Sequence, residues 1–267
     1  MIGGWDESGC VLAIAPAAWK LGNGSADKTS GNFPTYPSAL VAMALQNMGA
    51  GYGYDKDTGE IIMDGVNDYG SISPAQQLWG SVKPFSLETI IKPQITPAGF
   101  EVTFLFKDFD AAQAFRLMFA GDVATYLGMT ITCGANTARY GYGNRATFHN
   151  LKQHLVVTYN GLGLGVYGNW KFYIDGSPVA LSSYSGATGA NNTVNYIGAN
   201  VGPSSFTECE TWWTAVYNKV LSPARVAANY ALGDAMGLIG NNVGDLMNLT
   251  APGAAAIIPA GIFEGSH

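Results

Sequence analysis

The sequence predicts an all-β fold in which two antiparallel sheets pack as a jelly-roll sandwich. Short runs of alternating apolar and polar residues recur from about Glu60 to Tyr217, separated by glycine and asparagine. These runs are rich in the β-branched and aromatic residues that favour strands. The length of 267 residues suits a single large sandwich with one core. We therefore expect one sandwich rather than two average-sized domains.

The clearest predicted strand runs from Phe85 to Ile91. Residues with odd numbers in this run share one face, and Ser86, Glu88 and Ile90 share the other face. Further segments with the same character extend through the rest of the chain. They are Val102–Lys107, Ala114–Phe119, Met129–Cys133, His154–Tyr159, Lys171–Ile174, Val194–Ile197 and Thr211–Tyr217.

Two short helices are expected to interrupt the strands. Ser222 can cap a helix that begins at Pro223, and Gly233 stands where a left-handed C-terminal residue belongs, which predicts a helix over Pro223–Leu232. A second helix is predicted over Ala39–Met48, between Ser38 and Gly49, although its apolar residues are spread around the helix.

The chain divides into three segments. Residues 1–59 are interpreted as an N-terminal arm with the first strand or strands, and residues 60–236 as the sandwich. Residues 237–267 form a C-terminal arm that loses the strand alternation and is rich in glycine, alanine, proline and isoleucine. This apolar arm either folds back on its own sandwich or docks on a partner. Its candidate assembly residues are Ile257, Ile258, Ile262 and Phe263.

The composition narrows the classes of partner. Only 12% of the residues are charged and the net charge is -6, which argues against nucleic acid or an anionic lipid surface as a partner. No apolar stretch has the length of a membrane span, and the first residues lack the pattern of a secretory signal. The cysteines Cys10, Cys133 and Cys209 show no metal-binding spacing, so we expect buried thiols.

Four stretches, in this order, resemble the laminin G-like domains of the concanavalin A-like lectin/glucanase superfamily. The resemblance implies an early hairpin over the first stretch, a core strand, a central hairpin, and a closing strand that leads into a short helix. It also implies a first strand near Val11–Ala15. The stretches are Glu60–Tyr69, Phe85–Pro93, Gln153–Gly161 followed by Lys171–Gly176, and Ala215–Ser222.

Because this family includes glycosidases, the acidic residues decide whether catalysis is expected. Retaining hydrolysis uses two carboxylates about 5 Å apart. Glu208 and Glu210 share a strand face, but the third acid of the family's pattern is missing, and a turn explains Asp108 and Asp110 equally well. His154 is expected to be packed and hydrogen-bonded in the core. We therefore predict no catalytic residues.

Two kinds of binding site remain candidates. The resemblance implies one calcium ion on the sandwich rim, for which Asp64, Asn67 and Asp68 are the candidate ligands; the alternative is that these residues only form a turn. Carbohydrate binding would use exposed aromatic residues, and the alternative is that they fill loops and interfaces. The candidates are Tyr52, Tyr54, Tyr140, Tyr142, Trp212 and Trp213.

Three functions from different classes follow. The first is a non-catalytic structural or decoration protein of a phage particle, in the capsid or tail, made in the host cytoplasm and located in the virion. Its partners would be other virion proteins, further copies of itself and surface glycans. The second is an extracellular carbohydrate-binding lectin module, and the third is a glycoside hydrolase. We expect the first function, with glycan binding as an added role, and no cofactor other than the calcium considered above.

Overall fold

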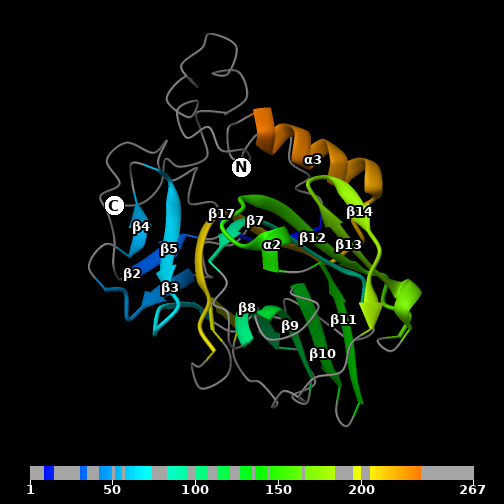
Figure 1. Cartoon of the computed structure of the whole chain (residues 1–267), viewed down its shortest axis with the longest axis horizontal. Coiled ribbons are helices and arrows are strands. Elements are labelled where there is room, and N and C mark those ends of the chain that lie inside the picture. The colour runs from blue at the N-terminus through cyan, green and yellow to red at the C-terminus, as the bar shows by residue number, and fades with distance from the viewer. Residues whose placement is uncertain are drawn as a thin grey trace.

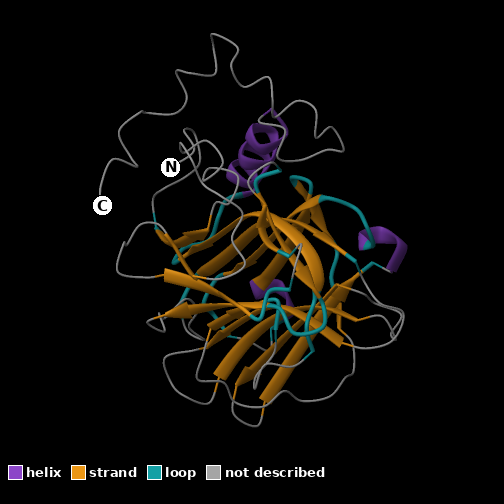
Figure 2. Cartoon of the chain, turned by 90° about the vertical axis from the view of Figure 1, so that its left-hand side faces the viewer, coloured by secondary structure: helices purple, strands orange, loops and turns teal. Residues whose placement is uncertain are grey.

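Two antiparallel sheets face each other in the computed structural model, with one long helix on the outside (Figure 1). The ribbon in Figure 2 shows the two layers of strands and places this helix beyond the upper layer. The residues that the structure describes are 9–14, 31–34, 42–49, 52–55, 58–73, 83–94, 100–107, 113–120, 127–133, 136–143, 145–163, 166–183, 195–199 and 205–235.

One sheet has eight strands, with β7 and β17 at its centre. Along the sheet the order is β14 (Ser177–Val179), β13 (Trp170–Ile174), β12 (Gln153–Tyr159), β7 (Phe85–Pro93), β17 (Glu208–Tyr217), β5 (Glu60–Asp64) and β4 (Gly53–Asp55), and β1 (Cys10–Ile14) also pairs with β17.

The second sheet has nine strands. Its order is β15 (Ser182–Ser183), β11 (Asn136–Tyr142), β10 (Leu127–Cys133), β9 (Gln113–Ala120), β8 (Phe100–Lys107), β16 (Asn195–Ile197), β6 (Tyr69–Ser73), β3 (Ala42–Gln46) and β2 (Gly31–Pro34).

The main core lies between the two sheets. Phe85 of β7 meets Phe115 of β9 with ring centroids 5.1 Å apart, and Trp170 stacks on Tyr159 at 4.2 Å. These side chains alternate along their strands with residues on the outer faces, as the period of two requires. Every strand predicted from the sequence is present, with its ends shifted by a few residues.

Helix α3 (Pro223–Ala235) covers part of the outer face of the eight-stranded sheet (Figure 2). The predicted cap is confirmed, since Ser222 Oγ accepts a hydrogen bond from Arg225 N at 3.2 Å. The predicted end is wrong, because Gly233 is a buried residue within the helix rather than the residue after it. Packing against the sheet outweighs the low helix propensity of glycine, which costs about 1 kcal/mol. Among the described residues, the other helical segments are α2 (Arg145–Phe148) and the 3-10 turn η1 (Tyr167–Asn169).

Two other expectations were wrong. Residues 42–46 of the predicted helix Ala39–Met48 form β3, because pairing with β2 and β6 decides the backbone conformation there. The early hairpin predicted over Glu60–Tyr69 does not exist, because β5 belongs to the eight-stranded sheet and β6 to the nine-stranded sheet. The turn between them therefore crosses from one layer to the other.

The segment before residue 60, which was interpreted as an arm with the first strand or strands, contributes strands to both sheets. Strands β1 to β4 all precede residue 60, and they pair within the two sheets. The C-terminal arm, with Ile257, Ile258, Ile262 and Phe263, lies outside the described residues. Within the described part of the chain, no helix has the length and apolar character to cross a membrane.

Candidate functional site

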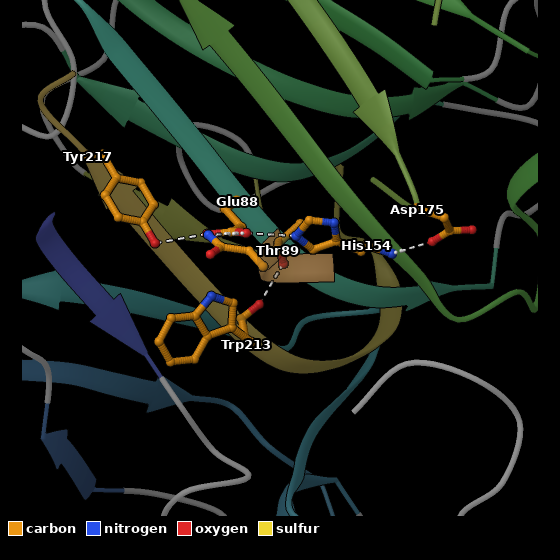
Figure 3. Close-up of polar contacts among 7 residues, drawn as sticks. Glu88, Thr89, His154, Asp175, Trp213 and Tyr217 are labelled. Carbon is orange, nitrogen blue, oxygen red and sulfur yellow. Dashed lines mark hydrogen bonds and ion pairs between the residues drawn. The ribbon is translucent and has the colours of Figure 1, made fainter. Parts of the chain in front are cut away.

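Glu88, in the middle of β7, is fully buried and has protein partners on both oxygens of its carboxylate (Figure 3). Its Oε1 accepts a hydrogen bond from His154 Nε2 at 2.7 Å, and its Oε2 accepts one from Tyr217 OH at 2.8 Å. Asn229 Nδ2 of α3 lies 3.0 and 3.1 Å from the two oxygens. We call Glu88, His154, Tyr217 and Asn229 the Glu88 cluster. All four side chains are buried, so protein groups replace water around the carboxylate.

The strand register explains how the Glu88 cluster assembles. Glu88 is opposite Val156 on β12 and Ala215 on β17, so His154 and Tyr217 are its diagonal neighbours, each two residues further along. All three therefore share the outer face of the sheet, where α3 lies over them. The prediction that His154 is packed and hydrogen-bonded is confirmed.

Asp175 fixes the other side of His154. The backbone N–H of His154 donates to Asp175 Oδ1 at 2.9 Å, and the backbone N–H of Asp175 donates to the backbone carbonyl of His154 at 2.9 Å. Asp175 and Gly176 have φ of 49° and 75°, and this Asp-Gly pair forms the tight turn between β13 and β14. Burial raises the pKa of Asp175, and the hydrogen bond from His154 opposes that rise. The cluster is closed to solvent and joins α3 to the sheet.

Of the acids considered for catalysis, Glu208 and Glu210 lie in the first half of β17, and Asp108 and Asp110 lie outside the described residues. Glu210 forms an ion pair with Lys92, whose Nζ is 2.8 and 3.1 Å from the two carboxylate oxygens. Glu208 is opposite Asp64 of β5. This ion pair gives the Glu210 carboxylate a cationic partner in the folded protein.

Lys152 joins this charged region to Trp212. Its Nζ is 3.8 Å from the centre of the Trp212 ring, a cation–π contact. Burial lowers the pKa of Lys152 to about 8, although Glu60 and Glu210 act in the opposite direction. Burial also raises the pKa of Glu60, and Glu210 adds to that rise.

Three of the aromatic candidates are buried, so the expectation that they are exposed was wrong. Trp212, Trp213 and Tyr54 are exposed by only 4%, 0% and 2%. An irregularity in the register of β17 between Thr211 and Trp213 turns both tryptophans to the outer face, where they belong to the apolar cluster that includes Val226 of α3. Tyr54 belongs to the core between the sheets.

The remaining aromatic candidates are not brought together. Tyr52 is 38% exposed, but Gly53 has φ of 100°, so the segment is not simply extended and Tyr52 does not share a face with Tyr54. Tyr142 packs on Phe148, with ring centroids 6.4 Å apart. Tyr140 lies in β11, and its side chain is outside the described part of the structure.

The candidate calcium residues form the turn that crosses between the sheets. Asp64 Oδ1 accepts hydrogen bonds from the backbone N–H groups of Val66, Asn67 and Asp68 at 2.7, 3.2 and 3.4 Å. Asp68 is fully buried; its Oδ2 accepts from Asp64 N, whereas its Oδ1 has no hydrogen-bond partner. Burial is the main cause that raises the pKa of Asp68 to about 6.

This turn could bind calcium only if carboxylate oxygens and other oxygen atoms act together as ligands. The buried Asp68 Oδ1 lacks a hydrogen-bond partner, as expected for an ion ligand, and Asp64 lies beside it. Across the described residues, however, no group of three or more His, Cys, Asp or Glu is arranged to hold a metal. Two carboxylates would therefore need carbonyl, amide or water oxygens to complete the shell of six or more that calcium takes.

Sequence reasoning missed most of the Glu88 cluster. A signal was present for Glu88, since it is the one acid in the apolar run Phe85–Ile91. A charged residue there needs partners if the strand is buried. No local signal indicated Asn229, because its contact depends on where α3 lies.

The two packed antiparallel sheets and the closing helix define a lectin-type jelly roll. The chain belongs to the concanavalin A-like lectin/glucanases superfamily, whose family model matches residues 64–227, more than half of the chain. This confirms the family resemblance found in the sequence. A search of curated proteins by sequence finds no match.

Solved structures with the same fold include Trypanosoma rangeli sialidase. Its complex with the inhibitor DANA has a TM-score of 0.54 at 16% identity, over 86% of this chain and 34% of the sialidase chain. The complex with sialic acid gives 0.53 at 16%, over 85% and 33%. The receptor-binding domain of botulinum neurotoxin type G gives 0.47 at 13%, over 84% and 51%. This chain thus spans about a third of the sialidases, and the likeness shows the fold alone.

Proposed function

We propose that this protein is a non-catalytic, glycan-binding jelly roll that serves as a structural or decoration component of a phage particle, in the capsid or tail. Within a superfamily of lectins and glucanases, this protein would act as a lectin and not as a hydrolase. Its second candidate setting, an extracellular lectin module, uses the same fold and the same binding chemistry.

The proposal that the protein is not an enzyme rests on the hydrogen bonds and ion pairs that Glu88 and Glu210 form within the protein. Glycoside hydrolysis needs one carboxyl group that can give up a proton to the substrate and a second carboxylate that reaches it. Glu88 is enclosed by His154, Tyr217 and Asn229, and Glu210 is paired with Lys92. These acids hold strands and a helix together, which favours a binding function.

Composition supports the particle setting. The chain has few charges for its length, and Cys10 and Cys209 are buried thiols outside any disulfide, which suits folding in a reducing cytoplasm. The apolar arm 237–267 supplies a segment that can dock on a neighbouring subunit. Conversion of Ile257 and Ile258 to Asp in the full chain should abolish incorporation into particles, whereas Leu162→Asp, at a loop position 78% exposed, should not. Equal incorporation of both variants would count against the arm.

The direct test of the binding function is a glycan array probed with the purified chain, together with a hydrolysis assay on the same glycans. We expect binding without release of sugar. Hydrolysis that survives Glu210→Gln and Glu208→Gln would show that the protein is an enzyme with other catalytic groups.

We also propose calcium at the turn of Asp64, Asn67 and Asp68. The buried Asp68 Oδ1 supports this proposal, because an ion would supply the partner that it lacks. Calcium added at pH 7.5 should raise the melting temperature of the wild type and leave Asp68→Asn unchanged. No difference between calcium and magnesium, or no shift at all, would argue for a turn that needs no ion.

A further inference from the structure

A group of aromatic side chains gathers on the outer face of the nine-stranded sheet, next to the turn that contains Asp68. Tyr69 of β6 and Tyr196 of β16 meet edge to face, with ring centroids 5.1 Å apart and planes at 72°. Phe206 lies 6.4 Å from Tyr69 on a tilted plane. We call these three residues the aromatic corner. All three are partly exposed, so the rings reach solvent instead of filling the core.

Strand register places polar groups beside the aromatic corner. Gln46 of β3 is directly opposite Tyr69, and Ser71 of β6 is directly opposite Tyr196, so these side chains share the outer face. Gln46 Nε2 donates to Ser71 Oγ at 3.4 Å, and Ser71 Oγ donates to the Ala44 carbonyl at 3.4 Å. The hydrogen bond to Ser71 holds the Gln46 side chain on the same face of the sheet as Tyr69.

Several polar atoms at this place have no hydrogen-bond partner among the residues that the structure describes. Within the described ranges, neither the hydroxyl of Tyr69, the hydroxyl of Tyr196 nor Oε1 of Gln46 forms a hydrogen bond. Burial raises the pKa of Tyr196, and nearby Tyr69 adds to that rise, so its hydroxyl keeps its proton at neutral pH. The corner thus combines apolar ring faces with two hydroxyls and an amide oxygen that are available to a ligand.

The chemistry of this surface selects one class of ligand. A pyranose ring has a face of C–H groups, which suits the negative face of an aromatic ring, and a rim of hydroxyls, which suits tyrosine and glutamine side chains. Tyr69, Tyr196, Phe206, Gln46 and Ser71 carry no charge. The chain has a net charge of -6, and none of these five side chains offers a cation to an anionic sugar, so an uncharged sugar fits this surface better.

We propose that the aromatic corner, with Gln46 and Ser71, is a binding site for an uncharged pyranose unit of a glycan. The sugar lies with its C–H face on one ring and its edge against the other, while Gln46 and the tyrosine hydroxyls bond to its hydroxyls. This proposal rests on the glycan-binding function proposed above and gives it a location. It also moves the site away from Trp212 and Trp213, which the sequence had suggested.

The test is an array of neutral and sialylated oligosaccharides probed with the full chain and with three variants. Tyr196→Ala removes one wall of the corner, Tyr196→Phe removes only the hydroxyl, and Leu162→Ala is the control at an exposed apolar residue outside the corner. Thermal melting of each variant checks that it is folded. We expect neutral glycans to bind the wild type and Leu162→Ala equally, and binding to Tyr196→Ala to fall by roughly tenfold or more, about 1.4 kcal/mol.

Intermediate loss in Tyr196→Phe would support the division between stacking and hydrogen bonding. Unchanged binding by a folded Tyr196→Ala would overturn this site and leave the glycan-binding function standing. Binding of sialylated glycans only would overturn the choice of a neutral sugar. If the wild type binds no glycan on the array, both this inference and the glycan-binding part of the proposed function fail. If Tyr196→Ala does not fold, Gln46→Ala replaces it, and the same loss of binding is required.

Discussion

His154 Nε2 lies 2.7 Å from Glu88 Oε1, and neither side chain is exposed to solvent. A charged group in such a place is stable only while its partners remain. Because Tyr217 and Asn229 also bond to Glu88, the cluster links β7, β12, β17 and α3.

Glu88→Gln should lower the free energy of unfolding by about 3–5 kcal/mol, the usual cost of breaking a buried charged pair. Urea unfolding followed by tryptophan fluorescence measures it. The matched control is Glu210→Gln, which breaks a partly exposed pair with Lys92 (side-chain exposures 17% and 31%) and should cost less than about 1 kcal/mol. If both variants lost the same free energy of unfolding, the Glu88 cluster would contribute no more to stability than the partly exposed pair.

Asn229→Ala should loosen α3 selectively. The change removes the donor that bridges both Glu88 oxygens, and hydrogen bonds to charged groups contribute about 1.5–3 kcal/mol. Amide hydrogen exchange should therefore become faster in residues 223–235 than in β9 and β10. Ala228→Asn, at an exposed position of the same helix, controls for helix propensity. Uniform loss of protection over the whole chain would contradict an anchoring role.

Asp68→Asn should change the acid dependence of stability. Burial raises the pKa of Asp68 from 3.8 to about 6, so between these values the folded state holds a proton that the unfolded state has lost. The wild type therefore loses stability as pH rises from about 4 to 6. Asparagine does not titrate, so the variant should lack this component and gain relative to the wild type above pH 6. Denaturation at pH 4, 5, 6 and 7.5 without calcium measures the free energy of unfolding of both proteins. Parallel dependence on pH in the wild type and in Asp68→Asn would contradict the prediction.

Lys152→Met should act in the alkaline range. Burial lowers the pKa of Lys152 to about 8, from 10.5, so between these values the unfolded state binds a proton that the folded state has released. Stability of the wild type should then rise with pH in this window relative to Lys152→Met. Unfolding curves at pH 7.5 and 10 measure the difference, and Lys83→Met, at an exposed lysine, should run parallel to the wild type. A wild-type curve parallel to that of Lys152→Met would refute the prediction.

The sequence was sufficient for the strands that it predicted, because their signal is local. Alternation over Phe85–Ile91 reported the two faces of β7 correctly, and Ser222 with Pro223 reported the start of α3. The helix prediction for residues 39–48 was wrong because the apolar residues fit both a helical and a strand period. Only pairing with β2 and β6 selects the strand. The turn after Asp64 failed because nothing local says whether the next strand stays in the same sheet.

The candidate sites depended on information that alternation does not carry. One irregular step in β17 brings Trp212 and Trp213 to the same face, and their burial depends on what packs over that face. The aromatic corner draws Tyr69, Tyr196 and Phe206 from segments more than a hundred residues apart in the chain, so no window of sequence contains it. Such sites become visible only when strand order and register are known.

Strand β17 has one further consequence, for the order of events during folding. It pairs with β7 along its length, and on its other side first with β5 and then with β1, so strands near residues 10, 60 and 90 all depend on residues 208–217. During synthesis these earlier strands must wait for β17 with unpaired edges exposed. Their closure is a contact of very high sequence separation, which makes slow folding and transient exposure to aggregation inherent to this topology.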